Sequence, residues 1–174
     1  MKALPLEGRP ITLRFDAGLR AHRGKLLAGS GARGIAVHAA SFVRRREIVL
    51  DRTLKKNREE CARVLVHELF HFAWVKLGNR MRREFERLLE GEMGSRARGE
   101  LGWSAEMRKV KLVPADLARR SSAWREYVCE SFCETGAWLY SGVGRHEEFT
   151  LAGRFRSARR EWFERSGFGV RIPV

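Results

Sequence analysis

The sequence has 174 residues, and its 35 Lys and Arg against 21 Asp and Glu give a formal net charge of +14. This length suits one domain with its own core, expected over residues 1–174, and a hydrophobic content of 44% argues against disorder. No run approaches the ~18 apolar residues of a membrane helix. The first seven residues lack the apolar stretch of a secretory signal, and the three cysteines suggest no disulfide framework. We therefore expect a cytoplasmic protein without a membrane partner.

The N-terminal third is predicted to form strands. Residues 11–15 alternate apolar and polar side chains, as a half-buried strand does. The glycine-rich, basic stretch 18–34 is predicted to be an irregular connection. Two further strands are expected at 35–42 and 47–50, joined by a turn at the three arginines 44–46.

Helices are predicted in the rest of the chain, at 57–77, 81–90, 122–140 and 151–165. The four glycines within 91–102 indicate a loop. Because the strands come first and the helices follow, the sequence favours an α+β domain.

A metal-binding motif lies inside the helix predicted at 57–77. His67, Glu68 and His71 form the pattern His-Glu-x-x-His. Residues four apart share one helix face, so both imidazoles can reach one ion. Zn²⁺ accepts neutral imidazole and lowers the pKa of its bound water towards ~7, and a nearby carboxylate can take the proton. We predict His67 and His71 as zinc ligands and Glu68 as the catalytic base; two incidental histidines are the alternative interpretation.

A catalytic zinc site needs a third protein ligand. The other histidines lack helical spacing to the motif: His22, His38 and His146. Better candidates are Glu126, Glu130 and Glu134, which are spaced by four along the helix predicted at 122–140. Stacked carboxylates repel one another unless a cation lies nearby. The alternative is an exposed acidic row paired with surface arginines.

The combination of His67-Glu68-x-x-His71 with Glu130-Ser-Phe-Cys-Glu134 resembles the gluzincin metallopeptidases. That group includes thermolysin-like enzymes, aminopeptidases and the catalytic domain of anthrax lethal factor. The resemblance implies a zincin-like fold with Glu130 as the third ligand and Glu134 as the acid that orients a ligand histidine. It covers only two helices, and the gap before Glu130 is longer than in the aminopeptidases, so Glu126 as ligand with Glu130 as the orienting acid stays open.

Other side chains near the motif receive less specific interpretations. Tyr127 and His146 are weak candidates for the donor that stabilises an oxyanion, and a buried aromatic is the simpler reading of Tyr127. Cys129 and Cys133 flank Glu130 and are interpreted as small buried helix residues rather than a thiolate site.

These observations predict a zinc-dependent peptidase that hydrolyses peptide bonds through a metal-bound water activated by Glu68. A second hypothesis is a regulatory or nucleic-acid-associated protein of zincin fold, with a narrow partner substrate or no catalysis. The positive net charge motivates it, although the basic residues are scattered rather than gathered in one tract. A metal-free structural protein is the third possibility.

Overall fold

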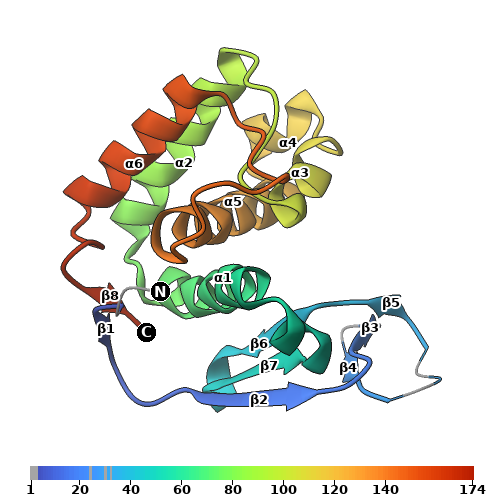
Figure 1. Ribbon diagram of the computed structural model, residues 1–174. Coiled ribbons are helices and arrows are strands. Elements are labelled where there is room, and N and C mark those ends of the chain that lie inside the picture. The colour runs from blue at the N-terminus through green and yellow to red at the C-terminus, as the bar shows by residue number, and fades with distance from the viewer. Residues whose placement is uncertain (1–3, 24, 30, 32) are drawn as a thin grey trace.

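The computed structural model describes residues 4–23, 25–29, 31 and 33–174. The described chain is mixed α+β, with small sheets in the N-terminal third and helices after them (Figure 1). Its strands are β1 (Leu6–Glu7), β2 (Thr12–Asp16), β3 (Arg20–His22), β4 (Lys25–Leu27), β5 (Ile35–Ala36), β6 (Ala39–Phe42), β7 (Glu47–Asp51) and β8 (Ile172–Pro173). Its α-helices are α1 (Arg58–Lys76), α2 (Asn79–Gly94), α3 (Trp103–Lys109), α4 (Pro114–Arg119), α5 (Ser122–Tyr140) and α6 (Gly153–Arg165).

The main sheet has the strand order β2-β7-β6, and α1 lies against it (Figure 1). β7 runs parallel to β2 and antiparallel to β6. Its residues Ile48, Val49 and Leu50 are at most 1% exposed, and Ile48 and Leu50 belong to the core cluster that includes residues of α1. β6 is an edge strand, so one side of its backbone faces away from the sheet.

The prediction of an irregular connection at 18–34 is wrong for residues 20–22 and 25–27, which form strands. β3 pairs antiparallel with both β4 and β5 and forms a second small sheet. Strands of two or three residues are too short to show the alternation of side chains by which a strand is recognised in a sequence. Residues 24, 30 and 32 lie outside the described part of the chain.

The strand predicted at 35–42 is two strands, β5 and β6. Val37 donates its N–H to Leu19 O, whereas His38 O accepts from Asp51 N–H. The chain therefore changes sheets between these two residues, with β5 pairing to β3 and β6 pairing to β7.

The region predicted as a loop at 91–102 is partly helical, because α2 continues to Gly94 and ends four residues beyond the predicted 81–90. Two short helices follow that the sequence did not indicate, α3 and α4. α6 begins at Gly153 rather than at 151. The two long helices agree with prediction, since α1 lies within the expected 57–77 and α5 spans 122–140.

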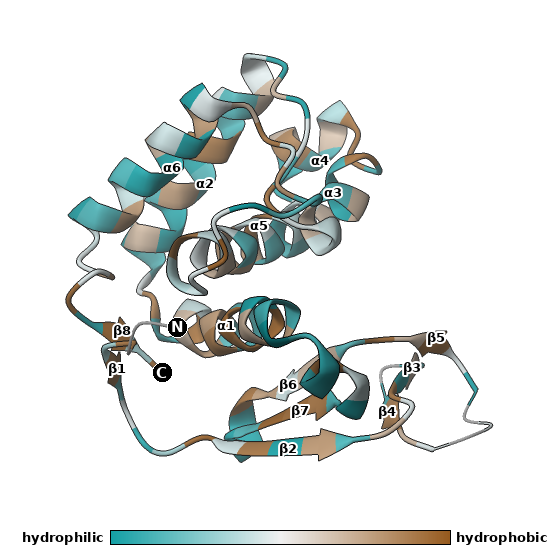
Figure 2. Ribbon diagram, viewed as in Figure 1, coloured by the Kyte–Doolittle hydropathy of each residue, from teal (hydrophilic) through white to brown (hydrophobic). Residues whose placement is uncertain are grey.

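The core lies where α1, α5, α2 and α6 meet, with α2 and α6 side by side and α1 between the sheet and α5 (Figures 1 and 2). It is rich in aromatic rings, among them Phe70, Phe132 and Phe163, none of which is exposed. Gly136 of α5 faces the Phe70 ring of α1 so closely that a Cβ would overlap it. This glycine therefore permits the close approach of the two helices that carry the predicted site. Among the described residues, no helix has the length and apolar character needed to span a membrane.

Candidate metal centre

The predicted ligand pair lies on the buried side of α1. Asn57 caps this helix, its side chain accepting a hydrogen bond of 3.1 Å from the N–H of Glu60. Ten residues later the motif faces α5 and the sheet, where His67 is 9% and Glu68 8% exposed. The Nε2 atoms of His67 and His71 lie 3.2 Å apart. One helical turn thus brings two imidazole nitrogens within reach of one ion.

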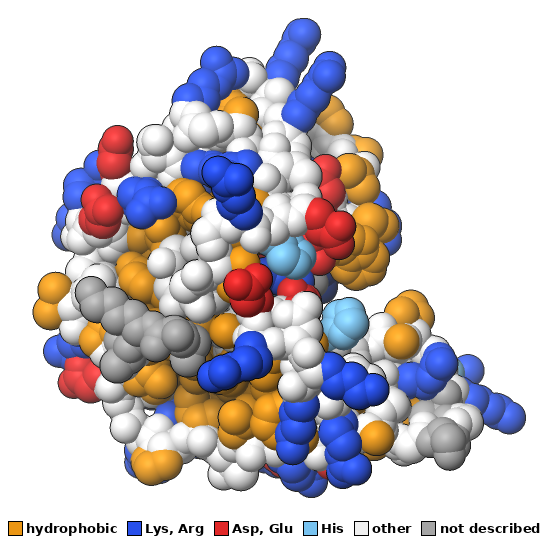
Figure 3. All heavy atoms as spheres, viewed as in Figure 1, with side chains coloured by type: hydrophobic (Ala, Val, Ile, Leu, Met, Phe, Trp, Pro, Cys, Tyr) orange, Lys and Arg blue, Asp and Glu red, His pale blue; other side chains and the backbone are white. Residues whose placement is uncertain are grey.

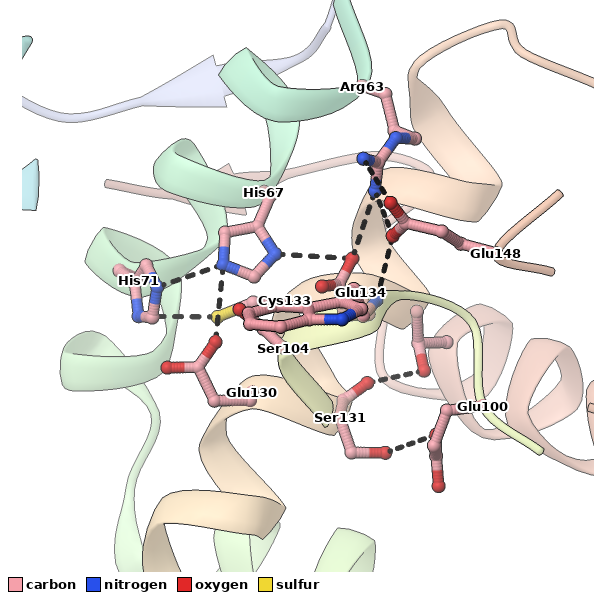
Figure 4. Close-up of polar contacts among 12 residues, drawn as sticks. Arg63, His67, His71, Glu100, Ser104, Glu130, Ser131, Cys133, Glu134 and Glu148 are labelled. Atoms are coloured by element: carbon pink, nitrogen blue, oxygen red, sulfur yellow. Dashed lines mark hydrogen bonds and ion pairs between the residues drawn. The ribbon is translucent and has the colours of Figure 1, made fainter. Parts of the chain in front are cut away.

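Two acids of α5 lie on either side of His67 (Figure 4). Glu130 Oε2 is 3.4 Å from His67 Nε2, the nitrogen that also faces His71. Glu134 Oε2 is 3.3 Å from the other ring nitrogen, Nδ1. Glu126 is exposed. The arrangement therefore favours Glu130 over Glu126 beside the histidine pair and puts Glu134 where an orienting acid is expected.

The charges of these groups depend on one another. Burial disfavours protonation of His67, but the Glu134 and Glu130 carboxylates outweigh it and raise the pKa of His67 well above its usual value. Burial would likewise raise the pKa of Glu130, yet the hydrogen bond and charge of His67 lower it to about 2. His67 and Glu130 therefore have the character of an ion pair.

Three polar residues that sequence reasoning missed also contact the site. Ser41 of β6 donates a hydrogen bond to the carboxylate of Glu68. Arg108 of α3 lies 3.3 Å from Glu130 Oε1. Arg63 lies 3.6 Å from Glu134 Oε2, an ion pair in which that buried oxygen makes no hydrogen bond within the described chain. Only Arg63 had a signal in the sequence, since it lies one helical turn before His67 on the same face.

Two thiols face the far side of His71. Its Nδ1 lies 3.5 Å from Cys133 Sγ and 3.8 Å from Cys129 Sγ. Cys133 is buried, as expected of a small helix residue, but Cys129 is only half-buried. A hydrogen bond with Cys133, together with His71, lowers the pKa of Cys129 to about 6, whereas burial raises that of Cys133 well above its usual value. The sequence interpretation of both as small buried helix residues holds for Cys133, and it did not include the contact of either thiol with a motif histidine.

The two weak candidates for an oxyanion donor lie elsewhere. Tyr127 is completely buried, and its hydroxyl donates a 2.6 Å hydrogen bond to Glu100 Oε1. Tyr127 is therefore a buried core aromatic, which agrees with the simpler of its two interpretations. His146 Nε2 lies 3.1 Å from Glu60 Oε2. His38, which had no assigned role, lines a cavity beside the motif.

Two cavities adjoin at the motif and share His67, Glu68, Ala39 and Ser104 as lining residues. The first has a volume of about 430 Å³ and extends along β6 towards Trp103 and Glu148. The second has a volume of about 350 Å³ and extends past Ser41 to Cys129 and Glu130. Figure 3 shows histidine and acidic side chains at the hollow between the helices and the sheet, with basic side chains around it.

A buried ion network supports α5 behind the site. Arg159 of α6 is fully buried and binds Glu92 through two hydrogen bonds of 2.9 and 2.7 Å. It also donates to Glu100 at 2.8 Å, and Glu100 accepts from Tyr127 of α5. Burial opposes ionisation of Glu100, but Arg159 and Lys109 lower its pKa to about 2. The network thereby ties α5 to α2 and α6.

The ligand distances fit a small tetrahedral ion in part. Donor nitrogens and oxygens about 2.0–2.2 Å from Zn²⁺ would lie roughly 3.3–3.5 Å from one another, and the separations of His67 from His71 and from Glu130 are 3.2 and 3.4 Å. Within the described chain, two sets of ligand atoms lie mutually within 4.8 Å: His67, Glu68 and His71; and His71, Cys129 and Cys133. Glu130 thus adjoins His67 without completing either set.

Comparison of the chain with protein-family models, with curated proteins and with solved structures gave no match. The geometry of the candidate centre is therefore the basis for a functional proposal.

Proposed function

We propose that the protein is a zinc-dependent peptidase with a zincin-like fold, in which His67, His71 and Glu130 hold the metal and Glu68 is the catalytic base. The observation that carries the proposal is the convergence of two imidazole Nε2 atoms 3.2 Å apart with a carboxylate oxygen 3.4 Å from one of them. All three side chains line the second cavity, and Glu68 lines it with them.

The donor types present suit a catalytic zinc ion, and their positions fit it in part, because Glu130 adjoins His67 without completing a ligand set. Two neutral imidazoles and one carboxylate are a donor set that Zn²⁺ accepts while keeping a fourth position open. When bound, the ion would supply a Lewis acid and lower the pKa of a coordinated water. Glu130 presents Oε2 to His67 Nε2 at 3.4 Å, while its other oxygen, Oε1, lies 3.3 Å from Arg108. Glu134 would accept a hydrogen bond from His67 Nδ1 and so present the Nε2 lone pair to the metal.

The two adjoining cavities form a groove that offers room and backbone hydrogen-bond partners for an extended peptide. β6 is an edge strand whose residues Ala39, Ala40 and Ser41 line the second cavity. A peptide can add to such an edge through main-chain hydrogen bonds, which are indifferent to its side chains. Ser41 holds the Glu68 carboxylate in place for proton transfer at the bound peptide. The substrate class that fits is therefore a peptide or an unfolded segment of a protein.

The test is peptide hydrolysis by the zinc-loaded protein and its Glu68→Gln variant. We expect Glu68→Gln to retain zinc and to lose about 10²–10⁴-fold in kcat/KM, since the amide cannot accept a proton. Glu59→Gln is the matched control, because Glu59 is an exposed acid of the same helix. Equal activity in wild type and Glu68→Gln would overturn the proposed role of this base.

Zinc content after single substitutions tests the ligands separately. Glu130→Ala is expected to lose most of the zinc, whereas Glu126→Ala, at an exposed position one turn earlier, is expected to retain it. The reverse result would make Glu126 the ligand. Less than about a tenth of an equivalent of zinc in the wild type, with no gain on supplementation, would favour the metal-free alternative.

The regulatory or nucleic-acid-associated hypothesis stays a prediction that rests on the net charge of +14. DNA binding by Glu68→Gln that weakens steeply with salt would support it, since phosphate contacts release counterions. Absence of binding at low salt would remove it.

A further inference from the structure

We infer that Cys129, Cys133 and His71 form a second metal site, which takes a thiophilic cation such as Cd²⁺ or Cu⁺. Cys129 and Cys133 are one helical turn apart on α5, so their thiols lie on the same face of the helix. That face is turned to His71 of α1, whose Nδ1 is the nitrogen remote from His67. Two thiolates and one imidazole are soft ligands, unlike the donor set of the proposed zinc centre.

The distances are close to those between ligands that share one ion. Sulfur at about 2.3 Å and nitrogen at about 2.0 Å from a tetrahedral Zn²⁺ would lie roughly 3.5–3.6 Å apart. The observed separations from His71 Nδ1 are 3.5 Å to Cys133 Sγ and 3.8 Å to Cys129 Sγ. These three ligand atoms form one of the two sets that lie mutually within 4.8 Å in the described chain.

The site is enclosed on one side and accessible on the other. Cys133 is completely buried, whereas Cys129 is half-buried and lines the second cavity together with His71. An ion can therefore enter from the groove and keep a fourth position open towards it. Cys61, the remaining cysteine, lines a different cavity near the start of α1.

The two sites share His71, and this makes their occupancy mutually exclusive. A neutral imidazole has one lone pair, either on Nδ1 or on Nε2. When Nε2 ligates an ion beside His67, Nδ1 keeps its proton and can only donate it to a thiol. When Nδ1 ligates an ion beside the thiolates, Nε2 carries the proton and leaves the first site with one histidine. A thiophilic cation would therefore inhibit the proposed zinc centre by withdrawing His71 rather than by replacing the zinc in place.

The thiolate site is tested independently of catalysis by titrating the metal-free, reduced protein with Cd²⁺. We expect an ultraviolet cadmium–thiolate charge-transfer band that saturates at about one equivalent. The band should be unchanged in Cys61→Ser and absent in the double variant Cys129→Ser/Cys133→Ser, with circular dichroism showing that each variant is folded. Cys129→Ser alone, at the half-buried position, should weaken Cd²⁺ binding by about tenfold or more. A band that survives the double variant, or one lost in Cys61→Ser, would overturn the inference.

Mutual exclusion rests on the proposed zinc centre and has a separate readout. Glu130→Gln, which removes a zinc ligand but no thiolate ligand, should retain the full cadmium band. Addition of one equivalent of Cd²⁺ to the zinc-loaded wild type should release zinc as the band grows, leaving about one ion per chain. Two ions bound together would overturn the sharing of His71. If the cadmium band appears but the protein does not hydrolyse peptides, the thiolate site is supported and only the peptidase proposal is refuted.

Discussion

Replacement of Arg159 by methionine should destabilise the fold more than neutralisation of any other single charged residue of α6. Arg159 is fully buried, and its guanidinium binds both Glu92 and Glu100. Methionine fills similar space but leaves two buried carboxylates without that partner. Breaking a buried ion pair by removing one member costs about 3–5 kcal/mol. The pKa of Glu100 gives a similar magnitude, since a decrease from 4.5 to about 2 corresponds to about 3 kcal/mol of preferential stabilisation of its charged form.

Urea unfolding followed by circular dichroism at pH 7 is the assay, with Arg160→Met as the control. Arg160 is exposed and lies 4.7 Å from the centre of the Trp138 ring, so its loss should cost less than about 1 kcal/mol. Because the folded-state pKa of Glu100 is lowered, its contribution is present above pH 4.5 and is lost as the pH falls towards 2. The difference in the free energy of unfolding between wild type and Arg159→Met should therefore decrease as the pH falls from 4.5 towards 2. Equal stability of Arg159→Met and Arg160→Met at pH 7 would refute the reasoning.

Two further substitutions test how α5 is held. Gly102→Ala would force a Cβ into the Glu134 carboxylate, so it should destabilise the protein by about 1–3 kcal/mol and weaken zinc binding, as measured by unfolding and by metal content. Gly144→Ala is its control, because a Cβ there meets nothing within 4 Å; equal effects of the two would contradict the steric argument. Tyr127→Phe should cost about 1–3 kcal/mol of stability by removing a hydrogen bond to Glu100, yet leave kcat of any peptidase activity near the wild-type value. A loss of about 10²-fold in kcat would contradict the assignment of Tyr127 to the core.

The long helices and the His-Glu-x-x-His motif could be predicted from the sequence. α1 begins after a capping asparagine and contains no proline or glycine, so its bounds follow from local signals. The spacing of Glu126, Glu130 and Glu134 indicated one acidic row, but the choice among them depended on how α5 is rotated against α1. That rotation is set by packing, such as the contact of Gly136 with Phe70, which leaves no mark on the spacing.

The polar surroundings of the motif were beyond sequence reasoning. Ser41 reaches Glu68 only because the chain leaves one sheet after Ala36 and enters another at Ala39. Arg159 is one of 35 basic residues, and nothing in its local sequence separates it from those in solvent. Burial of a charge is decided by partners distant along the chain, here Glu92 and Glu100. Patterns within one helix cannot contain that information.

The contact between Gly136 and the Phe70 ring also bears on the proposed zinc centre. Gly136 lies six residues beyond Glu130, or about 9 Å along α5, and its lack of a side chain allows α5 to approach α1 closely there. A larger side chain at residue 136 would push α5 away from α1 and change the distance between the two imidazoles and Glu130. In the proposed centre, the size of ion that fits would then depend on residue 136, which is not among the proposed ligands.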